Sequence, residues 1–324
     1  MKVAIIDDWQ EAARRNADWT QLAARAELQF FVEPFETVDA AATALADFDV
    51  IVPMRERTRL QLDLLERLPR LRLLALTGSG VRHVDVDYCN RHGILCCGSG
   101  GRSPASTAEF ALGLMLTAAR NIAACDANMR SGRFQHGLPL GIALEGKTLG
   151  VIGVGRIGTR VASYGKALGM QVLGWSQNLT DEQAAAAGVT RVGKQQLLSS
   201  ADVVSLHVVY SPRSHHLLKE EDLALLKPGA ILVNTARGPL IDETALLEVL
   251  SKGQISAALD VYDQEPLPAQ HPLRVLPNVV LTPHQGFSTQ QVFAGFYQQC
   301  VENILAFMDG TPVRVLNPQA LTAT

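Results

Sequence analysis

The sequence has few cysteines, no excess of basic charge and no long apolar run. Its five cysteines are an odd number without a C-x-x-C pair, which argues against a disulfide framework and against a zinc site. The 29 Lys and Arg residues against 32 Asp and Glu give a net charge of −3, so there is no basic field to attract nucleic acid. No stretch reaches the roughly 18 apolar residues that span a bilayer, and the opening apolar run, ended by two acids, does not resemble a signal peptide. We therefore expect a cytoplasmic protein that binds neither nucleic acid nor membrane, with no metal site.

The composition is that of a folded protein with about two domains. The chain has 324 residues, of which 47% are hydrophobic and 19% charged. Such an apolar content excludes a disordered chain, and the length corresponds to roughly two domains of 100–200 residues. Cys96 and Cys97 end a short apolar run and are expected to be buried thiols rather than catalytic ones.

Short apolar runs alternate with segments of helical periodicity along the whole chain, which predicts parallel sheets covered by helices on both faces. Two series of candidate strands suggest two doubly wound sheets, with the change of domain near the stretch 98–106. A long helix expected at 288–307 is followed by no further strands, so it should pack back onto the first domain and make that domain discontinuous. The expected strands are 3–7, 28–32, 50–54, 73–77 and 94–97, then 148–153, 171–175, 203–208, 230–234, 257–261 and 279–282.

A glycine-rich turn follows the expected strand 148–153 and opens a helix. Gly153, Gly155 and Gly158 form the pattern G-x-G-x-x-G. The first glycine permits a tight turn, the second lets the backbone approach a pyrophosphate, and the third allows close helix–strand packing. A merely tight strand–helix turn is the alternative, but the strand before and the helix after favour a dinucleotide site.

The residue at the position expected to hydrogen-bond the ribose of the dinucleotide is unusual. NAD-binding folds commonly place an acid about 20 residues after the glycines, at the end of the next strand. Here Ser176 stands there, followed by Gln177 and Asn178. The serine would not repel a 2′-phosphate, yet no Arg or Lys follows to bind one. The missing cation favours NAD, and NADP stays open.

Three polar residues follow later strands, at the edge where ligands of open α/β sheets bind. They are Arg237, Glu265 and His284, with Asp260 close to Glu265 in sequence. Taken singly, each could be an ordinary loop residue. Together they suit hydride transfer at a carbinol carbon: a histidine moves the hydroxyl proton, a carboxylate stabilises the protonated ring, and a guanidinium polarises the carbonyl. A nicotinamide cofactor would carry the hydride.

Four successive segments resemble the signatures of the D-isomer-specific 2-hydroxyacid dehydrogenases. They read LEGKTLGVIGVGRIG (144–158), NTARGPLIDETAL (234–246), ALDVYDQEPLP (258–268) and LTPH (281–284). The resemblance covers nearly the whole chain and implies two Rossmann-like domains with the active site in the cleft between them. Residues 1–100 and 290–324 would form the substrate domain, and 101–289 the dinucleotide-binding domain.

The resemblance also implies roles for individual residues. In catalysis, Arg237 would bind and polarise the substrate, and His284 would act as acid and base with Glu265 as its partner. Thr107 could instead cap its own helix, and Arg55 could instead form a surface ion pair. The implied cofactor contacts are Gly153, Gly155, Arg156, Ile157, Gly158, Ser176, Thr107, Ala236 and Asp260, and the implied substrate contacts are Arg55, Ser79, Gly80 and Arg237.

The expected reaction is the interconversion of a 2-keto acid and a D-2-hydroxy acid, and the resemblance implies a homodimer. Two alternatives share the fold. Formate dehydrogenation would need an amide in place of Glu265, and a cofactor-sensing corepressor would use an appended tail to recruit partners. Phe287 stands where the family usually has a second glycine after the histidine, and Val209 replaces a proline. These departures leave the identity of the 2-hydroxy acid open.

Overall fold

The computed structural model describes residues 1–100 and 103–322, which fall into two compact units. One unit is Met1–Arg102 with Ser288–Thr324, and the other is Ser103–Phe287. Residues 101–102, where the sequence places its first domain boundary, lie outside the described residues. Among the helices that the structure describes, none is long and apolar enough to cross a membrane.

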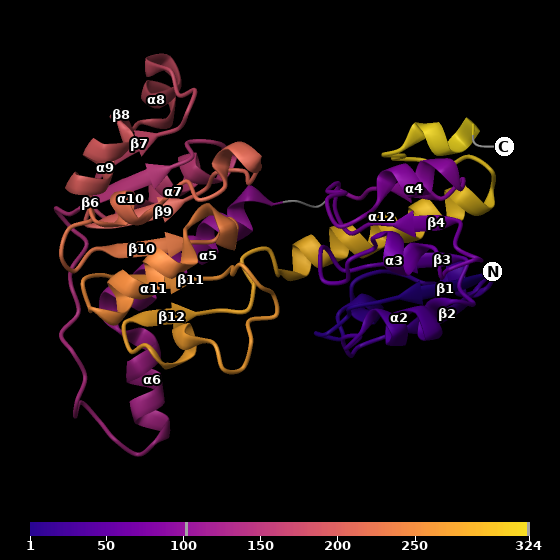
Figure 1. Cartoon of the computed structure of the whole chain (residues 1–324), viewed down its shortest axis with the longest axis horizontal. Helices are drawn as coiled ribbons and strands as arrows, with labels where there is room; N and C mark the ends of the chain where they lie inside the picture. The colour runs from indigo at the N-terminus through magenta and orange to yellow at the C-terminus, as the bar shows by residue number, and fades with distance from the viewer. Residues whose placement is uncertain (101–102, 323–324) are drawn as a thin grey trace. The chain divides into compact units, whose positions relative to one another are not determined.

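The first unit is built on a five-stranded parallel sheet with the order β2-β1-β3-β4-β5 (Figure 1). The chain turns back between β1 and β3, so the unit has a doubly wound topology with its switch point between these strands. The strands are β1 (Lys2–Ile5), β2 (Glu27–Phe30), β3 (Val50–Val52), β4 (Leu73–Ala75) and β5 (Leu95–Cys97). The helices are η1 (Ala13–Arg15), α1 (Thr20–Ala23), α2 (Val38–Leu45), α3 (Leu62–Leu65), α4 (Val86–Arg91), α12 (Gln290–Met308) and η5 (Pro318–Thr322).

The C-terminal segment forms part of this first unit. Thr289 caps α12 by accepting a hydrogen bond from the Val292 amide, and the helix then packs on β4 and α1. Beyond the helix, Val315 pairs with Cys97 in an antiparallel bridge. The Asn317 side chain, which is buried, accepts from the Cys96 amide at 2.7 Å. The tail therefore closes the β5 edge of the sheet.

The second unit contains a seven-stranded parallel sheet with the order β12-β11-β10-β9-β6-β7-β8. This is the doubly wound order of dinucleotide-binding domains, with β6 at the switch point. Its strands are β6 (Thr148–Ile152), β7 (Gln171–Trp175), β8 (Thr190–Arg191), β9 (Val203–Leu206), β10 (Ile231–Asn234), β11 (Ser256–Leu259) and β12 (Val279–Leu281). Its helices are α5 (Pro104–Arg120), α6 (Ile122–Arg130), α7 (Arg156–Ala167), α8 (Asp181–Ala187), α9 (Lys194–Ser200), η2 (Pro212–Ser214), α10 (Glu220–Leu223), η3 (Gly238–Leu240), α11 (Glu243–Ser251) and η4 (Pro272–Val275).

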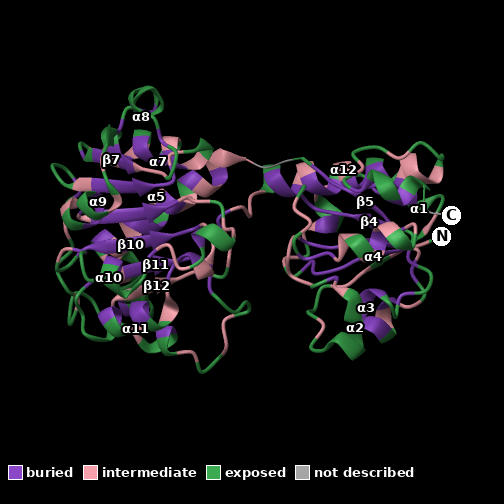
Figure 2. Cartoon of the chain, turned by 45° about the horizontal axis from the view of Figure 1, so that its top comes forward, coloured by how far each residue is buried: buried purple, intermediate pink, exposed green. Residues whose placement is uncertain are grey.

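Alternate residues of these strands enter two separate cores, one on each face of the sheet. Val204 and Leu232 pack with the leucines of α9, α10 and α11 on one face. Val203 and Val233 pack with α5, α7 and α8 on the other. Figure 2 shows the strands buried between exposed outer helix surfaces. Burial on both faces explains why the strands appear in the sequence as continuous apolar runs.

The two doubly wound sheets confirm the fold predicted from the sequence, and the expected strands are present with slightly shorter bounds. Most end one or two residues early because the last expected residues already belong to the loops that carry functional side chains. The expected strands omit β8, whose two residues are both exposed and give no apolar signal. Cys96 and Cys97 are buried on β5, as expected.

Candidate active site

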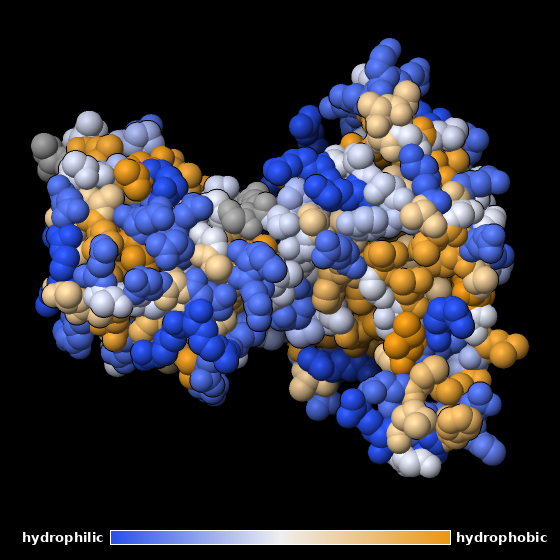
Figure 3. Space-filling model, turned by 180° about the vertical axis from the view of Figure 1, so that it is seen from behind, coloured by the Kyte–Doolittle hydropathy of each residue, from blue (hydrophilic) through white to orange (hydrophobic). Residues whose placement is uncertain are grey.

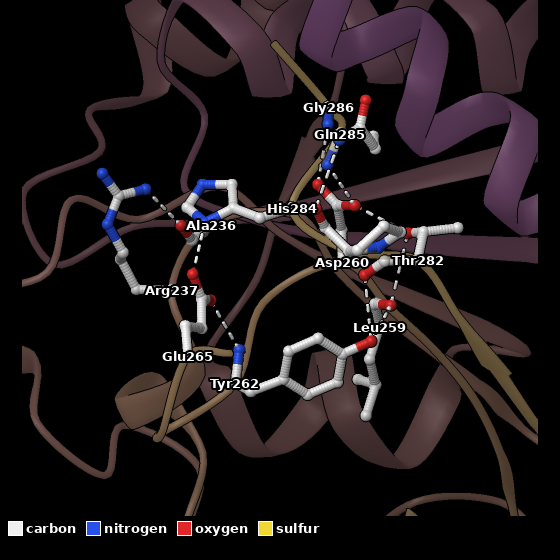
Figure 4. Close-up of polar contacts among 11 residues, drawn as sticks. Ala236, Arg237, Leu259, Asp260, Tyr262, Glu265, Thr282, His284, Gln285 and Gly286 are labelled. Carbon is white, nitrogen blue, oxygen red and sulfur yellow. Dashed lines mark hydrogen bonds and ion pairs between the residues drawn. The ribbon is translucent and has the colours of Figure 1, made fainter. Parts of the chain in front are cut away.

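Three neighbouring strands of the second sheet deliver Arg237, Glu265 and His284 to the same edge. Strand β10 pairs with β11, and β11 pairs with β12, all in parallel register. Arg237 follows β10, Glu265 follows β11, and His284 follows β12. Because carboxyl ends of parallel strands meet at one edge, residues separated by some 50 positions become neighbours (Figure 4).

His284 and Glu265 form a close pair. The His284 Nδ1 lies 2.6 Å from the Glu265 Oε2, and the side chains are 30% and 34% exposed, so the pair remains open to a ligand. The other Glu265 oxygen accepts the Tyr262 amide at 2.9 Å, which fixes the carboxylate. An ionised carboxylate can only accept hydrogen bonds, so the Nδ1 carries the proton and the Nε2 faces away from Glu265. This arrangement leaves one ring nitrogen available for proton transfer.

Asp260 holds the turn that presents His284. Its Oδ1 accepts from the Thr282 hydroxyl at 2.6 Å and from the Gln285 amide at 2.8 Å. Its Oδ2 accepts from the Gly286 amide at 2.8 Å. Burial raises the pKa of the Asp260 carboxyl, while these three donors act in the opposite direction. The tether allows His284 to adopt φ = 54°, a left-handed conformation that a histidine rarely takes.

Thr107 reaches the same turn from α5. Its methyl carbon lies 3.6 Å from the position that a Cβ on Gly286 would occupy, and the Asp260 Oδ2 lies 3.0 Å from that position. The structure therefore brings together Thr107 and Asp260, two of the residues expected near the cofactor. Their role in cofactor binding stays a prediction.

The turn that carries Arg237 is fixed by a residue the sequence reasoning did not select. Asn234, buried at the end of β10, accepts from the Ala236 amide at 3.0 Å and donates to the Arg237 carbonyl at 2.9 Å. The Arg237 guanidinium donates to the Ala236 carbonyl at 2.7 Å. Gly238 follows, and a Cβ there would collide with the backbone of Tyr262. The Arg237 and Glu265 loops therefore touch through their backbones.

Tyr262 is a second residue missed from the sequence. Its one hydroxyl proton is shared between the Leu259 carbonyl at 3.1 Å and the Thr282 carbonyl at 3.0 Å, which joins the ends of β11 and β12. Burial and the neighbouring Asp260 raise the pKa of this phenol. The sequence signal for both is a polar residue near the carboxyl end of an apolar strand: Asn234 is the last residue of β10, and Tyr262 lies three residues beyond β11.

The glycine-rich turn has the geometry of a pyrophosphate site. Gly153 has φ = 100°, and a Cβ on it would lie 2.6 Å from the His207 carbonyl carbon. A Cβ on Gly158 would collide with the Gly153 carbonyl, whereas one on Gly155 would meet no atom within 4 Å. The first-turn amides of Arg156 and Ile157 have no acceptor among the described residues. Open space beside free N–H groups at the start of α7 fits a dinucleotide pyrophosphate.

Ser176 is adjacent to this turn. Its hydroxyl oxygen accepts from the Val154 amide at 2.8 Å, so the residue after β7 touches the middle of the glycine loop. The hydroxyl proton is still available for a ribose oxygen, because this bond uses only the oxygen as acceptor. The position thus fits a neutral ribose contact.

In the first unit, Arg55 lies against the loop that contains Ser79 and Gly80. The Arg55 amide donates to the Thr77 hydroxyl at 2.7 Å. The guanidinium packs against Gly78, where a Cβ would collide with it. The amides of Ser79 and Gly80 have no acceptor among the described residues. A cation and free N–H groups are thereby gathered at the carboxyl ends of β3 and β4, which is suited to binding a carboxylate.

A doubly wound domain with a pyrophosphate turn, together with an arginine, a histidine and a carboxylate on one sheet edge, is typical of NAD-dependent oxidoreductases that act on CH–OH groups. Comparison with known families agrees. Residues 112–286 match the NAD binding domain of the D-isomer specific 2-hydroxyacid dehydrogenases. The chain belongs to this family.

Individual relatives have different named substrates. A D-3-phosphoglycerate dehydrogenase of Methanocaldococcus jannaschii is 43% identical over 249 residues, which cover 76% of this chain but 47% of that protein, so the chain spans about half of it. A glyoxylate reductase of Aeropyrum pernix is 37% identical over 304 residues, 89% of this chain and 88% of that protein. Among solved structures, a D-lactate dehydrogenase of Aquifex aeolicus complexed with NAD and lactic acid is 29% identical with a TM-score of 0.76, covering 95% of this chain and 96% of that one.

Proposed function

We propose that the protein interconverts a 2-keto acid and a D-2-hydroxy acid, with His284, Glu265 and Arg237 as its catalytic residues. The observation that carries this proposal is the 2.6 Å pair of His284 and Glu265 at the sheet edge of a dinucleotide-binding domain. NAD, when bound, supplies or accepts the hydride.

The residues of this chain manage the proton and the charge. His284 gives a proton to the carbonyl oxygen during reduction and takes it back during oxidation, and Glu265 orients the ring through Nδ1. Arg237 offers a planar fork of donors that polarises the carbonyl and binds the adjacent carboxylate. We also propose Arg55 and the amides of Ser79 and Gly80, in the first unit, as groups that bind the substrate. Formate oxidation moves no hydroxyl proton, so a paired acid and base is not suited to it.

The test is a panel of 2-keto acids assayed with NADH and NADPH in parallel. The panel includes glyoxylate, hydroxypyruvate, its phosphorylated form and longer aliphatic keto acids. Turnover of at least one with NADH, and its loss in a His284→Ala control, supports the proposal. NADH binding without reduction of any 2-keto acid would contradict it.

We also propose that the protein forms a homodimer through α6 and the segment that follows it. Ile122, Met129, Phe134 and Leu140 are 51%, 59%, 69% and 98% exposed, a density of apolar side chains unusual for a free surface. In Figure 1, α6 extends beyond the sheet before the chain returns to β6, and Figure 3 shows hydrophobic residues gathered on the surface of this unit. A second copy would cover them.

A further inference from the structure

The loops after β1 and β3 meet at the switch point of the first sheet, and a buried aspartate joins them. Asp7 stands two residues beyond β1, is 1% exposed, and has φ = 63°. Its Oδ1 accepts from the Thr58 hydroxyl at 2.9 Å. Its carbonyl accepts from the Arg57 guanidinium at 2.6 Å. Ligands of open α/β sheets bind at such a switch point, yet none of the roles assigned above uses Asp7.

The contacts of the loop after β3 extend beyond Asp7 itself. Arg57 also donates to the Gln10 side chain at 2.9 Å, and its guanidinium lies 4.3 Å from the centre of the Trp9 ring. The same loop carries Arg55, two residues before Arg57. Arg55 is tethered through its amide to Thr77 on one side, and the contacts of Arg57 and Thr58 with Asp7 hold the loop on the other. The loop that carries Arg55 is therefore held by Thr77 on one side and by Asp7 on the other.

The Asp7 carboxylate is placed at a cost to stability. Its Oδ2 is buried and has no hydrogen-bond partner among the residues that the structure describes, which is uncommon and costly for a carboxylate. Burial raises its pKa to about 6, although Thr58 and Arg57 act in the opposite direction. The other ionisable groups facing this cluster are Asp8, which caps Ala12 and Ala13 through their amides, and Tyr297 of α12. Asp7 therefore changes charge a little below neutral pH.

We propose that Asp7 is a positioning residue for substrate binding, and that its negative charge, through Arg57 and Thr58, holds the 53–58 loop so that Arg55 meets the substrate carboxylate. The proposal rests on the substrate-binding role assigned to Arg55 above. When Asp7 is protonated, Arg57 keeps its hydrogen bond to the Asp7 carbonyl but loses the electrostatic attraction of the carboxylate, and the loop relaxes. If only the ionised fraction binds substrate, KM rises by up to about tenfold between pH 7.5 and pH 5.

The test compares wild type with Asp7→Asn over this pH range. The expected result is a raised KM at pH 7.5 that no longer changes with pH, while kcat keeps the pH profile of the wild type. The variant should also be more stable than wild type at pH 7.5, because the wild-type carboxyl is easier to protonate in the folded state and its ionisation opposes folding. A residue that served the fold alone would lower stability when replaced. Unchanged KM and pH dependence in Asp7→Asn would overturn the proposal.

A measurement without turnover separates this proposal from the proposed function. The fluorescence of Trp9, which lies beside Arg57, is obtained as the difference between wild type and Trp9→Phe. This fluorescence should change with a step near pH 6. The same difference measured in the Asp7→Asn background should show no such step. Thr58→Val, a second variant of similar shape, should move the step to higher pH because it removes a donor to the carboxylate. If the fluorescence step near pH 6 persists in Asp7→Asn, the proposal that Asp7 controls the loop is wrong. An unchanged KM in Arg55→Ala instead overturns the substrate role of Arg55.

Discussion

At the scale of single residues, the proposed chemistry depends on the orientation of the His284 ring. Glu265 binds its Nδ1, and Asp260 tethers the next two amides, so the ring is fixed at its side chain and at its backbone. We expect His284→Ala to lower kcat by about 10²–10⁴-fold, the usual contribution of a general acid or base. NADH affinity, measured by fluorescence titration, should be unchanged because the pyrophosphate turn lies on other strands.

Glu265→Gln is the matched variant, since the amide can still accept a hydrogen bond from the ring but carries no charge. It should retain more activity than His284→Ala and show a shifted pH profile of kcat. Loss of NADH affinity with intact turnover in His284→Ala would contradict the assignment.

We expect that no other cationic side chain can replace Arg237. A lysine keeps the charge but loses the planar fork that can bind a carbonyl and a carboxylate together. We expect Arg237→Lys to lower kcat/KM by about 10²-fold, comparable to loss of one donor to a developing oxyanion. Arg67→Lys, at an exposed ion pair with Asp39, serves as the control and should behave as wild type. Wild-type kcat/KM in Arg237→Lys would refute the role.

At the scale of elements, two glycines of the turn between β6 and α7 are expected to have different roles, one in packing and one in cofactor binding. A Cβ on Gly158 would collide with the Gly153 carbonyl, so Gly158→Ala should destabilise the protein by about 1–3 kcal/mol, as overpacking does. A Cβ on Gly155 would meet no atom of the described residues within 4 Å, so Gly155→Ala should fold normally but fill the space proposed for the pyrophosphate. Urea unfolding and NADH titration of both variants check this. Equal effects of the two substitutions on stability would show that the turn is packed differently.

At the scale of the whole molecule, two buried histidines make stability depend on pH. Burial lowers the pKa of His83 in the first unit and of His207 in the second, each from 6.5 to about 4. At these two histidines the unfolded chain therefore binds more protons than the folded one between pH 6.5 and 4, so they lower the free energy of unfolding as the pH falls. The raised pKa of Asp7 acts in the opposite direction. His83→Asn and His207→Asn should each reduce this loss, measured by urea unfolding at pH 7 and pH 4.5. Slopes identical to wild type would indicate that other groups dominate.

The proposed dimer is also a property of the whole molecule. Leu140 is 98% exposed in the isolated chain, and a charge there would be buried against the second copy. We expect Leu140→Asp to shift the protein from dimer to monomer in light scattering, without loss of secondary structure. Leu225→Asp, at an exposed leucine of the same unit outside the α6 region, is the control. A wild type that is monomeric at all concentrations would exclude the dimer.

The sequence alone determined the features that depend on near neighbours in the chain. Continuous apolar runs indicated strands buried on both faces, and the three glycines indicated the turn at 153–158, because periodicity and backbone freedom act over a few residues. The positions of Arg237, Glu265 and His284 after successive strands predicted that they would share one edge of the sheet. The short β8 gave no such signal, since its two residues bury nothing.

Only the tertiary structure decided which polar groups meet. Asp260 lies 26 positions from the Gly286 amide it binds, and Asp7 lies 51 positions from Thr58. Ser176 meets the Val154 amide because β6 and β7 are adjacent strands. Such pairs follow from strand order and loop conformation, which many long-range contacts fix together, so no local pattern predicts them. The sequence thus supplied the proposed reacting groups, whereas the fold supplied the hydrogen bonds that orient them.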